Sequence, residues 1–365
     1  MVVFLIVMIM FGAFLEILSI KDELSRIHYQ CVPSKLGCEP GEVFLIHTTV
    51  TNYGRVTIPF LRLEEVLPKE IHIHGEEEEA RNDRSYIRSS LMYIRGRQKV
   101  KRTVHASLPK RGLYYLEGSR LYCGDFLGIR ENSRDFVQRE EIIIFPALLK
   151  DTSIFQALSG YYGDFSAKRL FTEDPILVNS YREYTGREPM RSISWIQSAR
   201  KNELMVKEFD HTMDMSVTLL LDTCLHWSDG TQADRMEYCF SLVRTIAEFL
   251  EKKKVSYRLL TNAYISNGST MSEILTKPGQ GANHFTTLLY ALGRAVPDTF
   301  HSIDDLYHNV VRNYSGENAI FYIAPFENEK RSKLVKNLRE QLGSQIYPIY
   351  ASKKSEVGQD VRKTV

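Results

Sequence analysis

The sequence predicts an α+β protein of several parts: an N-terminal membrane helix, a β-sandwich, and an α/β sheet of the wound type. Three observations predict it: the start of the chain is almost entirely apolar, short strand patterns separated by turn signals follow, and strand and helix patterns then alternate. A chain of 365 residues is also longer than one ordinary domain. The boundaries we expect are a membrane anchor at 1–20, a β-sandwich at 21–150, a connector at 151–211 and an α/β domain at 212–365.

The first twenty residues, MVVFLIVMIMFGAFLEILSI, carry a single charge at Glu16. At about 1.5 Å per residue, a helix of this length reaches roughly 30 Å, the thickness of the hydrocarbon core of a bilayer. The first basic residues, Lys21 and Arg26, come after the run, which predicts a single-pass anchor in the cell membrane with the body of the protein in the cytoplasm. A buried helix and a signal peptide are the alternatives, although no basic residue precedes the run and no A-x-A site follows it.

Composition narrows the classes of function. The formal net charge is +2, which gives no electrostatic footprint for nucleic acid. The five cysteines form no C-x-x-C pair, so neither a disulfide framework nor a zinc knuckle is indicated. The segment GQGAN at Gly279 lacks the lysine and the preceding strand of a phosphate-binding loop, so nucleotide binding has no support.

The region between Glu42 and Pro146 has the pattern of a β-sandwich. Short segments rich in β-branched and aromatic residues recur, with a turn at Asn52–Gly54, and they are EVFLIHTTV, VTIPFLRLEEV, KVKRTVHASL, RGLYYLEGSRLYC and EEIIIFPAL. Two charge runs interrupt them, acidic at Glu76–Glu79 and basic at Arg95–Arg102. We expect both runs to be solvent-exposed, with a patch for a partner as the alternative.

After Val217 the pattern is that of an α/β sheet. The run VTLLL is continuously apolar, as in strands buried on both faces. A helix is predicted from Gln232 to about Lys252, where apolar residues recur at intervals of three and four. Pro348 lacks a backbone N–H, which predicts that the last strand is at an edge of the sheet. The remaining strands are expected at Tyr257, Ala319 and Ile346, and the remaining helices at 285–292, 303–311 and 329–342.

Between these regions lies a segment that we call the box, residues 182–209, whose pattern resembles a known family. It is similar to the signature of the bacterial and archaeal proteins grouped as domain of unknown function 58, and the matching residues are Arg182, Tyr184, Gly186, Arg191, Ile193, Trp195, Ala199, Arg200, Leu204, Val206, Lys207, Glu208 and Phe209, followed by Leu221 and Asp222. Upstream, Arg111, Gly112, Tyr114, Asp125, Phe126 and Gly128 resemble a second family segment. The resemblance covers about residues 40 to 260.

The resemblance implies a membrane-anchored N-terminus, a β-sandwich, and a C-terminal domain similar to the von Willebrand factor A fold. It also implies an AAA+ ATPase of the MoxR type as a protein partner. Two departures are visible: Arg187 stands where the family has an aspartate, and the chain has one apolar segment where the family often has two.

Read for its chemistry, the box offers two main interpretations, and catalysis is a third that no complete set of catalytic residues supports. Arginines at 182, 191 and 200 can each bind a carboxylate through two hydrogen bonds, and Trp195 has a large apolar face. In the first interpretation the box is a latch that holds the domains, with Glu203 and Glu208 as counter-ions and the indole buried, so that Trp195→Ala costs about 3–5 kcal/mol. In the second it is an exposed surface that binds a partner or a carboxylate ligand.

The other candidate site is the loop that begins at Asp222. A von Willebrand factor A domain binds Mg²⁺ through D-x-S-x-S at the end of the first strand, but Cys224 and His226 occupy the two serine places. We interpret the loop as a degenerate metal site and expect no metal or other cofactor. A retained magnesium site, a zinc site and a Cys–His nucleophile pair are the alternatives.

These observations predict a non-enzymatic, membrane-anchored interaction or scaffold protein whose cytoplasmic α/β domain docks a protein partner. The alternative is a metal-dependent ligand binder or hydrolase that acts at the Asp222 loop. Loss of both serines favours the first.

Overall fold

The computed structural model describes residues 23–75, 85–124, 131–150, 178–209, 216–224, 231–267, 270–275, 277–296, 303–314, 319–343 and 345–351, with residues 4, 10, 156, 158–161 and 163. The chain divides into two compact units, the first with residues 1–147, 264–272 and 289–296, and the second with the remainder. Of the described helices, none is both long and apolar enough to cross a membrane. Most of the expected anchor lies outside the described residues, as do the acidic run at 76–79 and His226.

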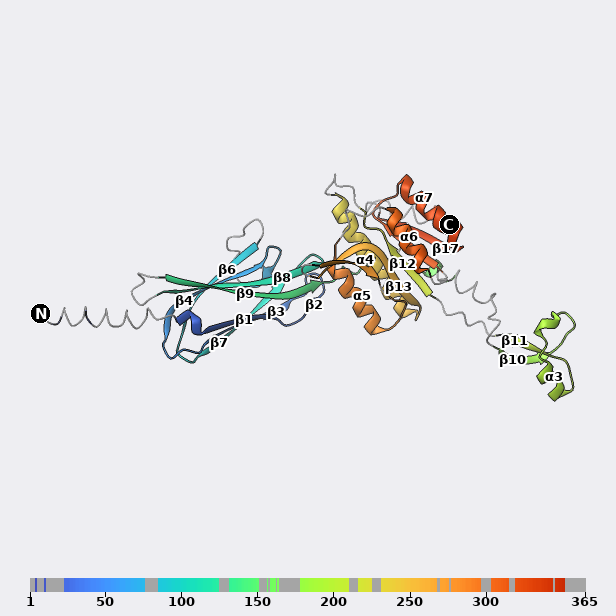
Figure 1. Cartoon of the computed structure of the whole chain (residues 1–365), viewed down its shortest axis with the longest axis horizontal. Helices are drawn as coiled ribbons and strands as arrows, with labels where there is room; N and C mark the ends of the chain where they lie inside the picture. The colour runs from blue at the N-terminus through green and yellow to red at the C-terminus, as the bar shows by residue number, and fades with distance from the viewer. Residues whose placement is uncertain are drawn as a thin grey trace. The chain divides into compact units, whose positions relative to one another are not determined.

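Two sheets occupy residues 27–144 (Figure 1). A short 3-10 helix, η1 (Glu23–Arg26), precedes the first strand. One sheet has the order β1 (Ile27–Pro33), β3 (Phe44–Asn52), β7 (Lys99–Ser107) and β5 (His72–Ile73). The other has the order β2 (Gly37–Cys38), β9 (Glu131–Ile144), β8 (Gly112–Gly124), β4 (Ile58–Pro68) and β6 (Ser85–Ile94). The longer strands pair antiparallel, and only the short β2 pairs parallel with its described neighbour β9.

The two sheets share one hydrophobic core, which is the arrangement of a β-sandwich. Alternate residues of β3, such as Phe44, Ile46 and Val50, are buried, as period-two alternation predicts. They form one cluster with residues of the other sheet, including Leu63 and Leu121. The sandwich therefore follows from strands that are each apolar on one face.

A mostly parallel sheet forms in the C-terminal part of the chain. Its order is β14 (Thr270–Leu275), β13 (Ser256–Asn267), β12 (Ser216–Leu221), β16 (Ala319–Ala324) and β17 (Gln345–Tyr350), and the two-residue strand β15 (Ala295–Val296) pairs with β13. β12 runs parallel to both of its neighbours, β13 and β16. β17 is the last strand of this order, as Pro348 predicts. Since β16 also runs parallel to β17, the sheet presents the ends of four parallel strands, β13, β12, β16 and β17, at one edge.

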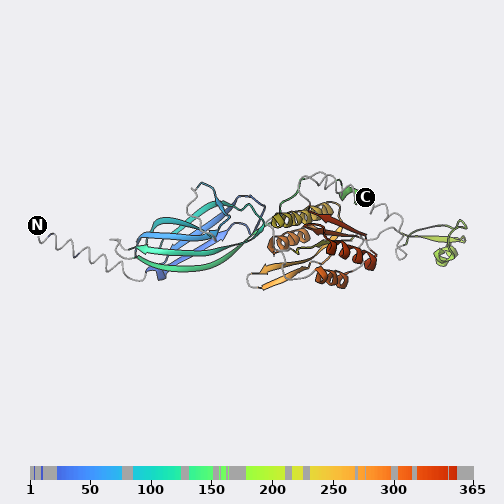
Figure 2. The same ribbon diagram turned by 90° about the horizontal axis from the view of Figure 1, so that it is seen from above.

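Helices cover both faces of this sheet (Figures 1 and 2). α6 (Ile303–Asn313) and α7 (Glu329–Leu342) pack on one face, where Leu306 and Leu334 join Leu220 and Ile320 in one cluster. α4 (Thr231–Lys252) contacts β12 and β16 and contributes no residue to that described cluster, which places it on the other face. α5 (Ala282–Arg294) is the remaining long helix of the described part. A mixed α/β architecture is thus confirmed, with helices where the apolar periodicity predicts them.

Candidate functional site

The box folds as a small two-stranded unit, whose strands and helix are labelled in Figure 1. β10 (Val178–Glu183) pairs antiparallel with β11 (Met205–Phe209), and η2 (Met190–Ser192) and α3 (Trp195–Lys201) lie between them in the chain. The Ser194 N–H donates to the Met205 carbonyl at 2.8 Å, and the Met205 N–H donates to the Ser198 hydroxyl at 2.8 Å. Asn202 ends the helix in the left-handed conformation (φ 58°), which short polar side chains tolerate. The mixed periodicity of the sequence reflects these four short elements.

The box buries few apolar side chains and exposes several others. Met205 and Val206 are 2% and 3% exposed, and Ile193 lies against them through an antiparallel bridge to Val206. Trp195, by contrast, is 62% exposed, and Ile196 is 71% exposed. Met190 and Leu204 are also exposed large apolar residues. The latch interpretation required a buried indole, so its predicted loss of 3–5 kcal/mol for Trp195→Ala does not apply to this structure.

The charged residues of the box pair differently from the sequence expectation. Arg182 forms an ion pair with Glu188 at 2.5 Å, and Glu188 also accepts a hydrogen bond from the Thr185 hydroxyl at 2.8 Å. These contacts, the Thr185 bond foremost, lower the pKa of Glu188 to about 2. The expected counter-ion Glu208 instead accepts a hydrogen bond from the Ser180 hydroxyl.

The other arginines of the signature have no ion-pair partner among the described residues. Arg191 and Arg200 are both exposed, and no described carboxylate lies within ion-pair distance of either. Glu203, which precedes β11, and Lys207, within β11, are likewise without an ion-pair partner among the described residues. The box thus presents free cationic groups beside its exposed apolar side chains.

The backbone of the box explains two further signature residues. Gly186 has a φ of +88°, which L side chains rarely adopt, so the turn after β10 requires glycine. The Tyr184 N–H donates to the Leu204 carbonyl at 2.8 Å and continues the pairing beyond β10. These two residues shape the unit, whereas Trp195, Arg191 and Arg200 remain available at its surface.

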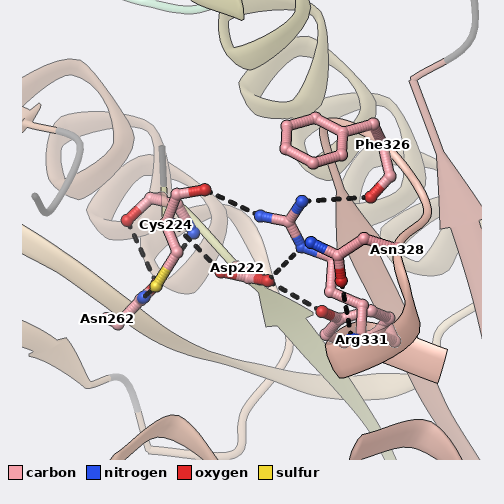
Figure 3. A network of polar contacts seen from close by, with 8 residues as sticks. Asp222, Cys224, Asn262, Phe326, Asn328 and Arg331 are labelled. Carbon is pink, nitrogen blue, oxygen red and sulfur yellow. Dashed lines mark hydrogen bonds and ion pairs between the residues drawn. The ribbon is translucent and has the colours of Figure 1, made fainter. Parts of the chain in front are cut away.

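Asp222 lies directly after the central strand β12 and is fully buried, at 0% exposure. Its Oδ1 accepts a hydrogen bond from the Cys224 N–H at 2.9 Å. Its Oδ2 accepts from the Tyr322 hydroxyl at 2.8 Å and from Nε of Arg331 at 2.7 Å (Figure 3). Since one buried carboxylate receives three donors from β16, α7 and its own loop, it joins these elements.

Arg331, on the first turn of α7, is the buried partner of Asp222. Its side chain is 1% exposed, and its Nη2 donates to the Cys224 carbonyl at 2.7 Å while Nη1 donates to the Phe326 carbonyl at 3.1 Å. The guanidinium also lies 4.3 Å from the centre of the Phe326 ring. Asn328 caps this helix and accepts from the Arg331 N–H at 2.8 Å, which places the residue at the sheet edge (Figure 3).

The electrostatics of this group follow from burial and from the charge of Asp222. Burial and the adjacent carboxylate raise the pKa of Tyr322, so the hydroxyl remains a neutral donor. Burial tends to lower the pKa of Arg331, but the Asp222 carboxylate outweighs it and the net shift is upward. Burial also raises the pKa of the nearby Cys239 thiol. The Arg331 guanidinium therefore stays charged throughout the physiological pH range.

The Arg331 guanidinium makes the kind of contacts that a hard cation makes. It binds one carboxylate oxygen and two carbonyl oxygens, all at the loop that the sequence pattern predicts to be a degenerate metal site. A divalent cation at Asp222 would have to displace or face this buried positive charge. The side chain of Asn262 completes the loop, since its Oδ1 accepts from the Thr223 N–H at 2.8 Å and its Nδ2 lies 2.9 Å from the Cys224 Sγ.

Of the residues predicted for the Asp222 loop, the structure describes Asp222 and Cys224, and His226 lies outside its described part. Within that part, no group of three metal-binding side chains lies together. Sequence reasoning missed Tyr322, Asn262 and Arg331. No local signal marks them, because each belongs to a different element far along the chain.

The comparisons with known proteins place the box in a family context. Residues 180–313 match the family described as "Protein of unknown function DUF58". The chain therefore resembles this family over the box and much of the α/β part. The match spans less than half of the chain. Of the similarity expected over about residues 40 to 260, the part before residue 180 lies outside the match. No curated protein shows significant sequence similarity.

Similarity to solved structures is weak. A CARDB domain from Pyrococcus furiosus is 11% identical, with a TM-score of 0.19 and coverage of 32% of this chain and 89% of that one. A cohesin module from Clostridium perfringens is 11% identical, with a TM-score of 0.23 and coverage of 33% and 95%. Salmonella alpha-2-macroglobulin is 14% identical, with a TM-score of 0.24 and coverage of 32% and 9%. At TM-scores below 0.5 these similarities carry no conclusion about fold or function.

Proposed function

We propose that the chain is a non-enzymatic interaction protein, held at the membrane by residues 1–20, that docks a protein partner on its cytoplasmic side. The observation that carries this proposal is the surface of the box, where Trp195 and Ile196 are 62% and 71% exposed. Met190 and Leu204 add to the same small unit, and the side chains of Arg191 and Arg200 are free to bind. Exposed aromatic and aliphatic groups beside arginines have the composition of binding hot spots.

The partner that we propose is an AAA+ ATPase of the MoxR type, on the basis of the family resemblance. We further propose a von Willebrand factor A-like fold for the C-terminal part. The central position of β12, the parallel pairing on both of its sides and the helices on both faces support this fold. In this proposal the α/β domain and the box together form the cytoplasmic docking part.

Chemistry at Asp222 is the less favoured function. Its carboxylate already binds Tyr322, Cys224 and Arg331, and it has no exposed surface to offer a substrate. A catalytic or metal-binding carboxylate needs a free oxygen that faces its ligand. We therefore assign this group to the stability of the sheet edge.

Binding of the purified MoxR-type ATPase from the same cell tests the docking proposal. The full-length chain in detergent solution is immobilised, and the variant Trp195→Ala is compared with Leu91→Ala, a control whose side chain is 69% exposed on β6. Because a hot-spot aromatic contributes about 2 kcal/mol or more, we expect Trp195→Ala to weaken binding about 30-fold and the control to leave it unchanged.

Hydrogen exchange of the box amides serves as the folding control, since removal of an exposed side chain is expected to change stability by about 0.5 kcal/mol or less. Equal binding by the two variants would refute docking through the box. Absence of ATPase binding by the unmodified chain would refute the proposed partner.

A further inference from the structure

A surface pocket of about 940 Å³ lies on the β-sandwich. Its lining residues all precede the box and Asp222 in the sequence. Its lining comes from the end of η1 with the start of β1, from the turn after β3, from the turn before β7 and from β9. Arginines 26, 55, 97 and 134 contribute one side chain from each of these four segments. The basic run at 95–102, which the sequence interpretation left as a solvent-exposed hairpin, thus supplies one member of a cationic cluster.

The pocket has a large excess of positive charge. Among the described residues, no hydrogen-bond acceptor or carboxylate binds the side chains of Arg26, Arg55 or Arg97. Arg134 donates to the Leu24 carbonyl at 2.8 Å. Because this acceptor is neutral, it does not compensate the charge of Arg134. Asp135 is the acidic residue among the described lining, and it is engaged by Arg120 at 2.5 Å, outside the pocket. Like charges that gather without counter-ions favour an anionic ligand.

The two turns that carry Arg55 and Arg97 are held in place by a buried side chain. Asn52 is 2% exposed, and its Nδ2 donates to the Val56 carbonyl at 2.9 Å and to the Arg95 carbonyl at 3.2 Å. The Arg97 N–H in turn donates to the Gly54 carbonyl at 2.8 Å. The cationic groups therefore project from a fixed scaffold, which lowers the entropic cost of binding.

Apolar groups line the same pocket. Tyr53 and Val137 are 70% and 92% exposed, and Phe136, which precedes Val137 in β9, is half-buried. An inorganic anion would gain nothing from these side chains. A ligand with a phosphate group and an apolar portion could contact both the arginines and the apolar side chains of the lining.

The position of the pocket in the sequence indicates where such a ligand comes from. Arg26 is the sixth residue after Ile20, the end of the expected anchor, so a spanning anchor would hold η1 and β1 at the headgroup layer. We propose that this pocket binds the headgroup of an anionic phospholipid, with the arginines on the phosphate and Tyr53 and Val137 toward the acyl region. The choice of a lipid over a free phosphate rests on the proposed membrane location.

Titration of the full-length chain in neutral detergent micelles tests the pocket directly, with ³¹P NMR as the readout. The ligands are short-chain phosphatidylglycerol, short-chain phosphatidylcholine and inorganic phosphate. The double variant Arg55→Gln and Arg97→Gln is compared with Lys99→Gln and Lys101→Gln, two exposed lysines of β7 outside the pocket. Since a basic residue near the membrane surface contributes about fivefold in affinity, we expect the pocket variant to bind phosphatidylglycerol about 25-fold more weakly.

The control should bind within about twofold of the unmodified chain, and phosphatidylcholine should bind at least about tenfold more weakly than phosphatidylglycerol. Equal loss in both double variants would overturn the site, and inorganic phosphate binding as tightly as the lipid would overturn the assignment to a lipid. Should the double variant fail to fold, Arg26→Gln alone is expected to lose about fivefold. The titration in micelles does not require the anchor to span, so it is independent of the test of docking through the box.

Discussion

Replacement of Arg331 by methionine is the most direct test of the role assigned to the Asp222 group. The variant keeps an apolar stem of similar length but removes the guanidinium, so the Asp222 carboxylate keeps only the Tyr322 hydroxyl and the Cys224 N–H as donors. The Cys224 and Phe326 carbonyls each lose a donor as well. Because both partners are almost fully buried, the loss of one leaves an uncompensated charge, which costs about 3–5 kcal/mol.

Hydrogen exchange measures this loss of stability locally, at the amides of the strand directly before Asp222. In the full-length chain in detergent solution, the amides of β12 should exchange roughly 10²- to 10⁴-fold faster in Arg331→Met. The matched control is Lys333→Met, an exposed lysine two residues further along α7, which should change the free energy of local opening by about 0.5 kcal/mol or less.

The double variant Asp222→Asn with Arg331→Met separates the charge effect from packing. Since it removes both charges, we expect it to be less destabilised than the sum of the two single variants, with a coupling of about 1–3 kcal/mol. An increase in exchange of less than about tenfold in Arg331→Met would refute the reasoning, because a buried carboxylate without its partner cannot cost so little.

Four other outcomes follow from the structure. Carbonate washing should leave the full-length chain in the membrane fraction, and release of the chain would contradict the predicted anchor. The carboxyl of Glu188 should titrate near pH 2 by NMR, and the stability that its contacts give is fully present above its ordinary pKa of 4.5 and is lost as the pH falls to about 2; Thr185→Val should move the midpoint upward. Burial raises the pKa of Cys31 to about 11, so mass spectrometry should find no alkylation there at pH 8 until the chain is unfolded. Calorimetric titration of the full-length chain with millimolar Mg²⁺ should give no saturable isotherm, and a one-to-one isotherm that disappears in Asp222→Asn would restore the metal-dependent alternative.

The sequence alone determined the elements whose apolar pattern is local and strong. The run at 217–221 is a strand buried on both faces, α7 has the predicted bounds, and α4 begins one residue before the predicted Gln232. In each of these segments the spacing of the apolar residues indicates which side of the element is buried, because apolar residues that recur at that interval lie on one face. Pro348 likewise predicted an edge strand from its missing N–H alone.

Two strands that bury polar side chains were not predicted from the sequence. β6 was missed because it contains Arg88, which a hydrophobic pattern treats as exposed, although its side chain is 5% exposed and pairs with Glu65 at 2.8 Å. β1 was missed as well, since its buried residues include Tyr29, whose hydroxyl donates to the same Glu65. Burial of a polar group costs little free energy only when the group has a hydrogen-bond or ion-pair partner, and here the partner lies on another strand.

The tertiary structure also decided what the two candidate sites can do. The sequence placed Asp222 at a strand end, where ligands commonly bind, but its occupant Arg331 lies 109 residues further along the chain. The sequence likewise marked Trp195 as important without deciding its exposure, because Ile193 and Val206 are buried by the register of a short hairpin that leaves Trp195 outside. Which residues face a ligand depends on contacts between distant segments, and these contacts leave no local pattern in the sequence.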